Sequence, residues 1–329
     1  MFHSANALHR LGHEVNVVSD IENKFTWFGL QGPNFVRTHK EDYPDADILI
    51  ASGCGSVKRV LTAPKVKGSK VWWVRGHETW IMKGNELQTL YLSPHIRKVV
   101  NSVCLQKFLK RKTGLVFPVV RPGMDLEVFK PLRVRNWEEK SEFIIGTLYS
   151  EKKTKRFKWL GAICKGLKNS AVDFRLKLFG TFEAPVGFKY DEYLYKPSQE
   201  GLCRFYNNVD FWIAPTESEG LHIPPQEAIL CGCVVIGAIG ELNGMSDYLD
   251  NQVTGFTLKS PEKVVELISS FYHNPQKRKR LGEVSEAAIA KVKSLGDRKR
   301  NMSELVYLFR SFVEKDRRKE SLDLRRMRR

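Results

Sequence analysis

The residues whose types and spacing could do chemistry lie in one stretch, from Val209 to Gly240, which reads VDFWIAPTESEGLHIPPQEAILCGCVVIGAIG. Its loop ends in Glu219, and Glu227 follows after seven intervening residues, just inside a helix opened by Pro224-Pro225. Two carboxylates can accept hydrogen bonds from vicinal hydroxyls, which is how proteins hold sugars. The same spacing also fits a solvated loop followed by a glutamate that complements a helix dipole. The spacing alone therefore leaves both interpretations open.

The elements around these glutamates favour a ligand site. Apolar runs predict strands from Val209 to Ala214 and from Cys233 to Ala238, joined through a helix that Gly232 ends. Such strands indicate a parallel sheet covered on both faces, in which ligands bind beyond the carboxyl ends of the strands. Because proline suits the first helical turn, the backbone donors of residues 226–228 would face outward toward an anion or hydroxyls.

A basic cluster follows another predicted strand. The strand runs from Glu142 to Leu148, and five lysines or arginines lie between Ser150 and Lys158, where a helix begins near Phe157. Cations directly past a strand end suit a diphosphate, through charge and point hydrogen bonds. A solvated basic turn is the competing interpretation.

A third polar cluster, Arg75-Gly-His77-Glu78-Thr-Trp80, follows the predicted strand KVWWV. Aromatic faces stack on pyranose rings, and His77 can donate or accept a hydrogen bond. The alternative is a histidine with satisfied hydrogen bonds beneath a tryptophan. Chemistry alone weighs the two equally.

Composition sets the bounds of the problem. The chain has 329 residues, 42% hydrophobic and 28% charged, which is enough for two globular domains. No run of about 18 apolar residues is present to span a membrane, and the first residues lack the apolar core of a signal peptide. Six scattered cysteines without a CxxC pair predict reduced thiols and a cytoplasmic location.

The net charge of +17 calls for an anionic partner. Nucleic acid, an anionic membrane face and an anionic substrate are the three candidates. No helix-turn-helix, zinc-finger or RNA-recognition motif accompanies the charge, which argues against nucleic acid. The tail from Lys315 to Arg329 has eight basic and three acidic residues, and we expect it either to lie peripherally on anionic lipid or to be disordered.

The wording PTESEGLHIPPQEAILCGCVVIG resembles the signature of the retaining nucleotide-sugar glycosyltransferases of family 4. The resemblance implies an α/β protein with the GT-B fold, in which two doubly wound Rossmann-like domains face each other across a cleft. It also implies transfer of a sugar from a nucleotide-diphosphate donor to a hydroxyl acceptor, a saccharide, glycolipid or polysaccharide, with retention of configuration. No metal and no cofactor beyond the donor is expected, and Asp45-Ala-Asp47 is interpreted as a turn.

The resemblance also assigns roles to residues. Glu227 would hold the nucleotide ribose, Glu219 the sugar hydroxyls and Lys155 the diphosphate, while the backbone near Leu221 and His222 would contact the sugar. The catalytic set is Glu219, Lys155 and His77. The remaining donor-binding candidates are Thr216, Gly220, Lys153 and Arg156.

The predicted domains are an N-terminal Rossmann-like domain (1–135), a nucleotide-sugar-binding domain (136–300), a helix crossing back (301–314) and a basic tail (315–329). The N-terminal domain shows no match to the first strand and glycine-rich loop of the family. Within it we expect a strand from Leu115 to Val120, and the polar piece from Arg133 to Lys140 is interpreted as the interdomain linker.

Two other function classes stay open. One is a nucleotide-sugar epimerase or hydrolase on the same architecture. The other is a non-catalytic basic binding protein, which the charge favours.

Overall fold

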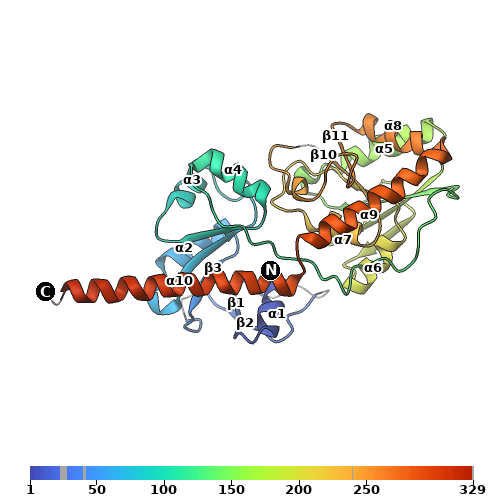
Figure 1. Cartoon of the computed structure of the whole chain (residues 1–329). Coiled ribbons are helices and arrows are strands. Elements are labelled where there is room, and N and C mark those ends of the chain that lie inside the picture. The colour runs from blue at the N-terminus through green and yellow to red at the C-terminus, as the bar shows by residue number, and fades with distance from the viewer. Residues whose placement is uncertain (23–27, 40–41, 239, 328–329) are drawn as a thin grey trace. The chain divides into compact units, whose positions relative to one another are not determined.

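A computed structural model describes residues 1–22, 28–39, 42–238 and 240–327. The chain divides into two compact units (Figure 1). Unit 1 comprises Met1–Gly123 and Asp297–Arg329, and unit 2 comprises Met124–Gly296. Both contain parallel strands and helices, so the α/β class expected from the sequence is confirmed. None of the helices that the structure describes is long and apolar enough to span a bilayer.

Unit 2 is built on one six-stranded sheet. Its strands are β6 (Phe143–Tyr149), β7 (Phe174–Gly180), β8 (Glu192–Tyr195), β9 (Phe211–Ala214), β10 (Val234–Ala238) and β11 (Phe256–Leu258). They lie in the order β11-β10-β9-β6-β7-β8, and every neighbouring pair is parallel. The chain therefore builds outward from β6 in one direction and then, starting with β9, in the other. The point between β6 and β9 is the topological switch point of a doubly wound sheet.

Side chains alternate between the two faces of this sheet. In β9, Phe211 and Ile213 join one core cluster, while Trp212 and Ala214 join the other. Because successive residues of a strand point to opposite faces, a strand buried on both faces is continuously apolar. The run FWIA is apolar for this reason.

The helices of unit 2 cover both faces of the sheet. They are α5 (Lys158–Asn169), α6 (Gln199–Asn207), α7 (Ile223–Leu230), α8 (Pro261–Tyr272) and α9 (Lys279–Ser294). The leucines and isoleucine of α5 and the apolar face of α8 pack on one side, and α6 and α7 pack on the other. Ser198 caps α6 by accepting a hydrogen bond from the Gly201 amide at 3.1 Å, and prolines occupy the first turn of α7.

Unit 1 contains two smaller parallel sheets among its described residues. One pairs β1 (Asn16–Ser19) with β2 (Asn34–Arg37), and the other has the order β3 (Ile48–Ala51), β4 (Ser69–Val74), β5 (Arg97–Val100). Its helices are α1 (Phe2–Arg10), α2 (Cys54–Thr62), α3 (Gly84–Leu92), α4 (Val103–Thr113) and α10 (Arg298–Met327).

Helix α10 packs against the β3-β4-β5 sheet. Its apolar residues Met302, Leu305, Phe309 and Phe312 form a cluster with residues of β4 and β5. Farther along the helix, Asp316 accepts hydrogen bonds from Arg97 at 2.7 Å and from Ser69 at 2.5 Å. The basic tail predicted from Lys315 is thus helical through Met327, continuous with the preceding segment.

Two sequence-based expectations about this region need correction. Leu115 to Val120 is no strand: Val119 forms only an isolated bridge with Val100. The reason is that Pro118 has no amide hydrogen to donate to a ladder. The piece from Arg133 to Lys140 belongs to unit 2, whose boundary follows Gly123, because the preceding residues Met124 and Phe129 are buried in its core.

Candidate functional site

Three loops of unit 2 meet at the carboxyl ends of β6, β9 and β10. The loop after β9 is joined to the loop after β6 by the Glu217 amide, which donates to the Thr154 carbonyl at 3.3 Å. It is joined to the loop after β10 by two hydrogen bonds of 2.8 Å, from the Glu219 amide to Leu242 and from the Gly244 amide to Glu219. Because β6 and β9 flank the switch point, this is where a doubly wound sheet binds its ligand.

The basic loop and the acidic loop face each other through two ion pairs. Lys155 Nζ contacts Glu219 Oε1, and Arg156 contacts Glu217 at 2.7 Å. The side chains of Lys155 and Glu219 are 18% and 27% exposed, so both groups can still reach a ligand. Arg156 has the left-handed φ of 47° and lies over the ring of Trp159 at 5.2 Å. Two groups assigned to the diphosphate and to the sugar are therefore neighbours.

His222 caps the start of α7 in an unusual conformation. Its φ is 60°, and its carbonyl accepts a hydrogen bond of 2.8 Å from the buried Tyr248 hydroxyl. Its side chain is buried, and the Nδ1 atom has no hydrogen-bond partner in the described structure. Burial, and secondarily the charge of Lys155, holds the pKa of His222 well below its usual 6.5. A neutral imidazole therefore lies beside the amides of the first turn of α7.

This pKa predicts a specific loss of stability in acid. Below pH 6.5 the unfolded chain binds a proton at His222 that the folded chain does not, so the stability present above that pH falls by up to about 1.4 kcal/mol per pH unit. Asparagine tolerates positive φ and does not titrate. We expect His222→Asn to flatten the dependence of the urea midpoint on pH between 5.0 and 7.5. An unchanged slope in the variant would contradict a neutral, buried His222.

Glu227 lies in α7 and is oriented by a tyrosine. The Tyr206 hydroxyl, from α6, donates to Glu227 Oε2 at 3.1 Å. Tyr206 is fully buried, and burial together with the neighbouring Glu227 carboxylate raises its pKa well above 10. Tyr206 therefore stays a hydrogen-bond donor at neutral pH and fixes the carboxylate in place.

The remaining predicted residues divide between the backbone and the surface. Leu221 and Thr216 are buried, and a side chain at Gly244 would clash with the Gly220 carbonyl, so this stretch can present only its backbone. Lys153 is exposed in the 3-10 turn Lys153–Lys155.

Sequence reasoning missed Asn243. Its Nδ2 donates to Ala238 at 2.7 Å and to Thr216 at 3.3 Å, and its Oδ1 accepts from the Met245 amide at 3.1 Å. Asn243 thereby ties the loop after β10 to the loop that carries Glu219. An asparagine directly before a glycine, in Leu-Asn-Gly, was the available signal of a turn.

His77 lies in unit 1, and the structure describes it within that unit. Its Nδ1 is 3.3 Å from the Tyr91 hydroxyl, and its ring packs on Phe108 of α4 with centroids 5.0 Å apart. Glu78 of the same cluster accepts a hydrogen bond of 2.5 Å from the Cys54 amide and so caps α2. Glu78 is therefore structural, while Trp80 is largely exposed. A catalytic role of His77 stays a prediction.

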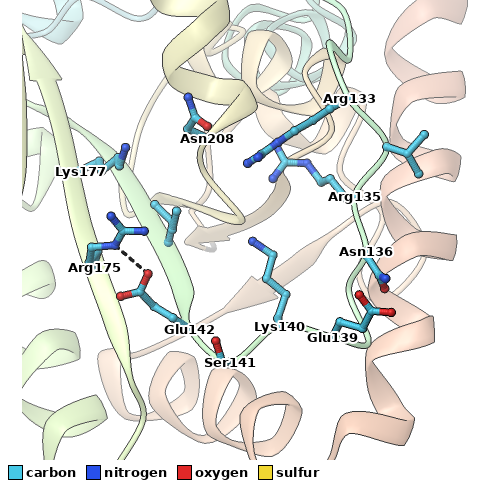
Figure 2. Close-up of a pocket in the computed structure, with 12 residues that line it drawn as sticks. Arg133, Arg135, Asn136, Glu139, Lys140, Ser141, Glu142, Arg175, Lys177 and Asn208 are labelled. Carbon is cyan, nitrogen blue, oxygen red and sulfur yellow. Dashed lines mark hydrogen bonds and ion pairs between the residues drawn. The ribbon is translucent and has the colours of Figure 1, made fainter.

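A cavity of about 650 Å³ lies at the other edge of the sheet of unit 2 (Figure 2). Its walls include Arg135 and Lys140 from the chain before β6 and Arg175 from β7. Both Arg135 and Lys140 bind the buried carboxylate of Asp210, at 3.1 and 2.7 Å. Arg175 pairs with Glu142 at 2.7 Å. These cations stabilise the amino ends of the strands, and none of the predicted site residues lines this cavity.

Comparison with known proteins bears on the same unit. Residues 191–287 match the family model described as Glycosyl transferases group 1, and this segment includes both glutamates of the signature. A search of curated proteins found no match to the sequence.

Solved structures resemble the whole chain. A glycosyltransferase from Rickettsia africae superposes with a TM-score of 0.75 at 13% identity, covering 94% of this chain and 93% of that one. Sucrose-phosphate synthase from Thermosynechococcus elongatus gives 0.73 at 13%, covering 95% and 92%. Anabaena HepE in complex with UDP-glucose gives 0.72 at 13%, covering 93% and 94%. At this identity the likeness shows the fold, and the predicted GT-B α/β class with parallel sheets is confirmed.

Proposed function

We propose that this chain transfers a sugar from a nucleotide-diphosphate sugar to a hydroxyl acceptor, with retention of configuration. The observation that carries the proposal is the meeting of Lys155, Glu219 and the start of α7 at the switch point of unit 2. A group 1 glycosyltransferase match over the same segment supports it. The solved complex of HepE with UDP-glucose makes UDP-glucose the first donor to test.

In this proposal the basic loop and α7 divide the donor between them. Lys155 and Arg156 bind the diphosphate, and they neutralise the charge that develops on it as the bond to the sugar breaks. Glu227, held by Tyr206, accepts hydrogen bonds from the ribose hydroxyls. Glu219 and the backbone of residues 220–222 hold the sugar.

Binding of the donor has to exchange partners in the site. Lys155 and Arg156 are paired with Glu219 and Glu217, so a diphosphate must replace carboxylates as their anion. The exchange leaves Glu219 able to accept hydrogen bonds from sugar hydroxyls. Catalysis would then come from positioning and from charge stabilisation of the leaving group.

A thermal-shift measurement with a panel of sugar nucleotides tests donor binding. A donor at a hundred times its Kd stabilises the folded state by about 2.7 kcal/mol, which for a domain of this size raises the Tm by roughly 5 to 10 °C. We expect this rise with UDP-glucose or another sugar nucleotide, and none with free glucose. A panel in which no sugar nucleotide shifts the Tm would contradict the proposal.

The fate of the bound donor separates transfer from the competing reactions. We incubate donor with and without a saccharide acceptor, in the presence of EDTA. Transfer consumes donor only when acceptor is present and yields a product of the same anomeric configuration. Consumption of donor without acceptor would instead identify a hydrolase, and appearance of a second sugar nucleotide would identify an epimerase.

A further inference from the structure

Unit 1 carries a basic surface that the proposed function does not use. No aspartate or glutamate occurs between Glu86 and Asp125. Within this stretch Lys107, Lys110 and Arg111 are exposed on α4, which packs beside α3 through a hydrogen bond of 3.1 Å from Gln88 to the Lys112 carbonyl (Figure 1).

These three cations share one face of α4. Positions i, i+3 and i+4 of a helix lie on the same side. The opposite side of α4 is apolar and buries Leu105, Phe108 and Leu109 in unit 1. The cationic face is therefore directed outward by the packing of the helix.

Two aliphatic side chains are presented directly after this helix. Leu115 and Val116 are 43% and 61% exposed. Their backbone is fixed: Gly114 ends α4 at a φ of 75°, the Leu115 amide donates to Thr113 Oγ1 at 3.1 Å, and Gln106 Nε2 donates to the Phe117 carbonyl at 2.6 Å. Phe117 itself is buried. The exposed pair is thus held outward by an ordered turn next to the basic last turn of α4.

We propose that these five residues, Lys107, Lys110, Arg111, Leu115 and Val116, form a surface, called here the α4 surface, that binds an anionic lipid bilayer. Cations are attracted to anionic headgroups, and adjacent aliphatic side chains enter the boundary between headgroups and acyl chains. Single-stranded nucleic acid is bound through cations interleaved with aromatic stacking platforms, and an aliphatic pair offers no such platform.

The basic part of α10 fits a bilayer less well. Its cations from Lys315 to Lys319 share the helix with Asp316, Glu320 and Asp323, which offset them. The α4 surface has no such acidic neighbours in sequence.

Lipid binding would also locate the loop that carries His77. The His77 ring packs on Phe108, on the buried side of α4, so this loop lies about one helix diameter, roughly 10 Å, from the lipid-facing side. The α4 surface goes beyond the proposed function, because it requires no donor and is measured without one.

Co-sedimentation of the full chain with vesicles tests this surface. Vesicles of 70% phosphatidylcholine and 30% phosphatidylglycerol should bind the protein at 0.1 M salt, and pure phosphatidylcholine vesicles should bind it far less. Because each cation near an anionic surface contributes about fivefold in affinity, Lys107→Glu/Lys110→Glu/Arg111→Glu should lower the partition coefficient at least about tenfold. Leu115→Ser/Val116→Ser should lower it about fivefold with the charge unchanged.

The matched control is Lys315→Glu/Arg318→Glu/Lys319→Glu, which makes the same charge change on α10. We expect it to retain most of the binding. Equal loss in both triple variants, or full binding by the α4 triple variant, would overturn the proposal. Binding to a 30-nucleotide RNA without binding to the vesicles would also overturn it. Circular dichroism and the thermal shift with sugar nucleotide, which depends on unit 2, report whether each variant is folded.

Discussion

Replacing Lys155 with alanine is expected to lower turnover about a hundredfold, the usual effect of removing one group that stabilises transition-state charge. The expectation follows from the place of Lys155 at the switch point of unit 2, where it contacts Glu219. Glu219→Ala is expected to have an effect of similar size, because Glu219 both orients Lys155 and is assigned to the sugar hydroxyls. Initial rates of sugar transfer at saturating donor measure both variants.

The matched control is Lys165→Ala, which removes an exposed lysine from α5 in the same unit. It should retain the parent rate. The double variant Lys155→Ala/Glu219→Ala is expected to be less impaired than the product of the two single effects, because the two side chains act as a pair. Parent activity in both single variants would show that this cluster is not the site.

The second large effect is expected on stability, from Asp210→Asn. Asp210 is 1% exposed and accepts hydrogen bonds from Arg135, Lys140 and the Ile144 amide. Loss of its charge leaves two partly buried cations without their anion, and breaking such a buried pair costs about 3 to 5 kcal/mol. Urea unfolding, followed by tryptophan fluorescence, measures the change in the free energy of unfolding.

Glu266→Gln serves as the control for Asp210→Asn. It removes an ion pair of similar length, 2.6 Å to Lys263, whose two side chains are more than half exposed. Exposed pairs of this kind contribute at most about 1 kcal/mol. If the two variants lost the same free energy, the buried carboxylate of Asp210 would have no special role in joining the chain before β6 to the sheet.

Much of the local structure of unit 2 was predictable from periodicity. The strand from Phe174 to Gly180 was predicted with the bounds that the structure shows, and β9 and β10 lie within the predicted apolar runs. Such runs are informative because a strand buried on both faces is continuously apolar. The short edge strand β11 was taken for a loop, since three residues carry too little pattern to distinguish the two.

The ligand-binding chemistry was predictable in part. The signature singled out Glu219 and Glu227, and the charge of the loop after β6 singled out Lys155. The partners of these residues were not found: Tyr206 and Asn243 act through single hydrogen bonds across the fold, and their spacing in the sequence carries no sign of them. The predictions that the site transfers sugar and that His77 takes part still await the experiments above.

The sequence by itself determined which segments are strands and helices, because hydrophobic periodicity and turn residues act over a few positions. It also determined which loops carry the cations and the carboxylates. Only the tertiary structure decided that β9 returns to pair with β6, on the side opposite β7. That return creates the switch point and brings Lys155 against Glu219, 64 positions later in the chain. The order of parallel strands depends on packing between distant segments, and no local pattern records it.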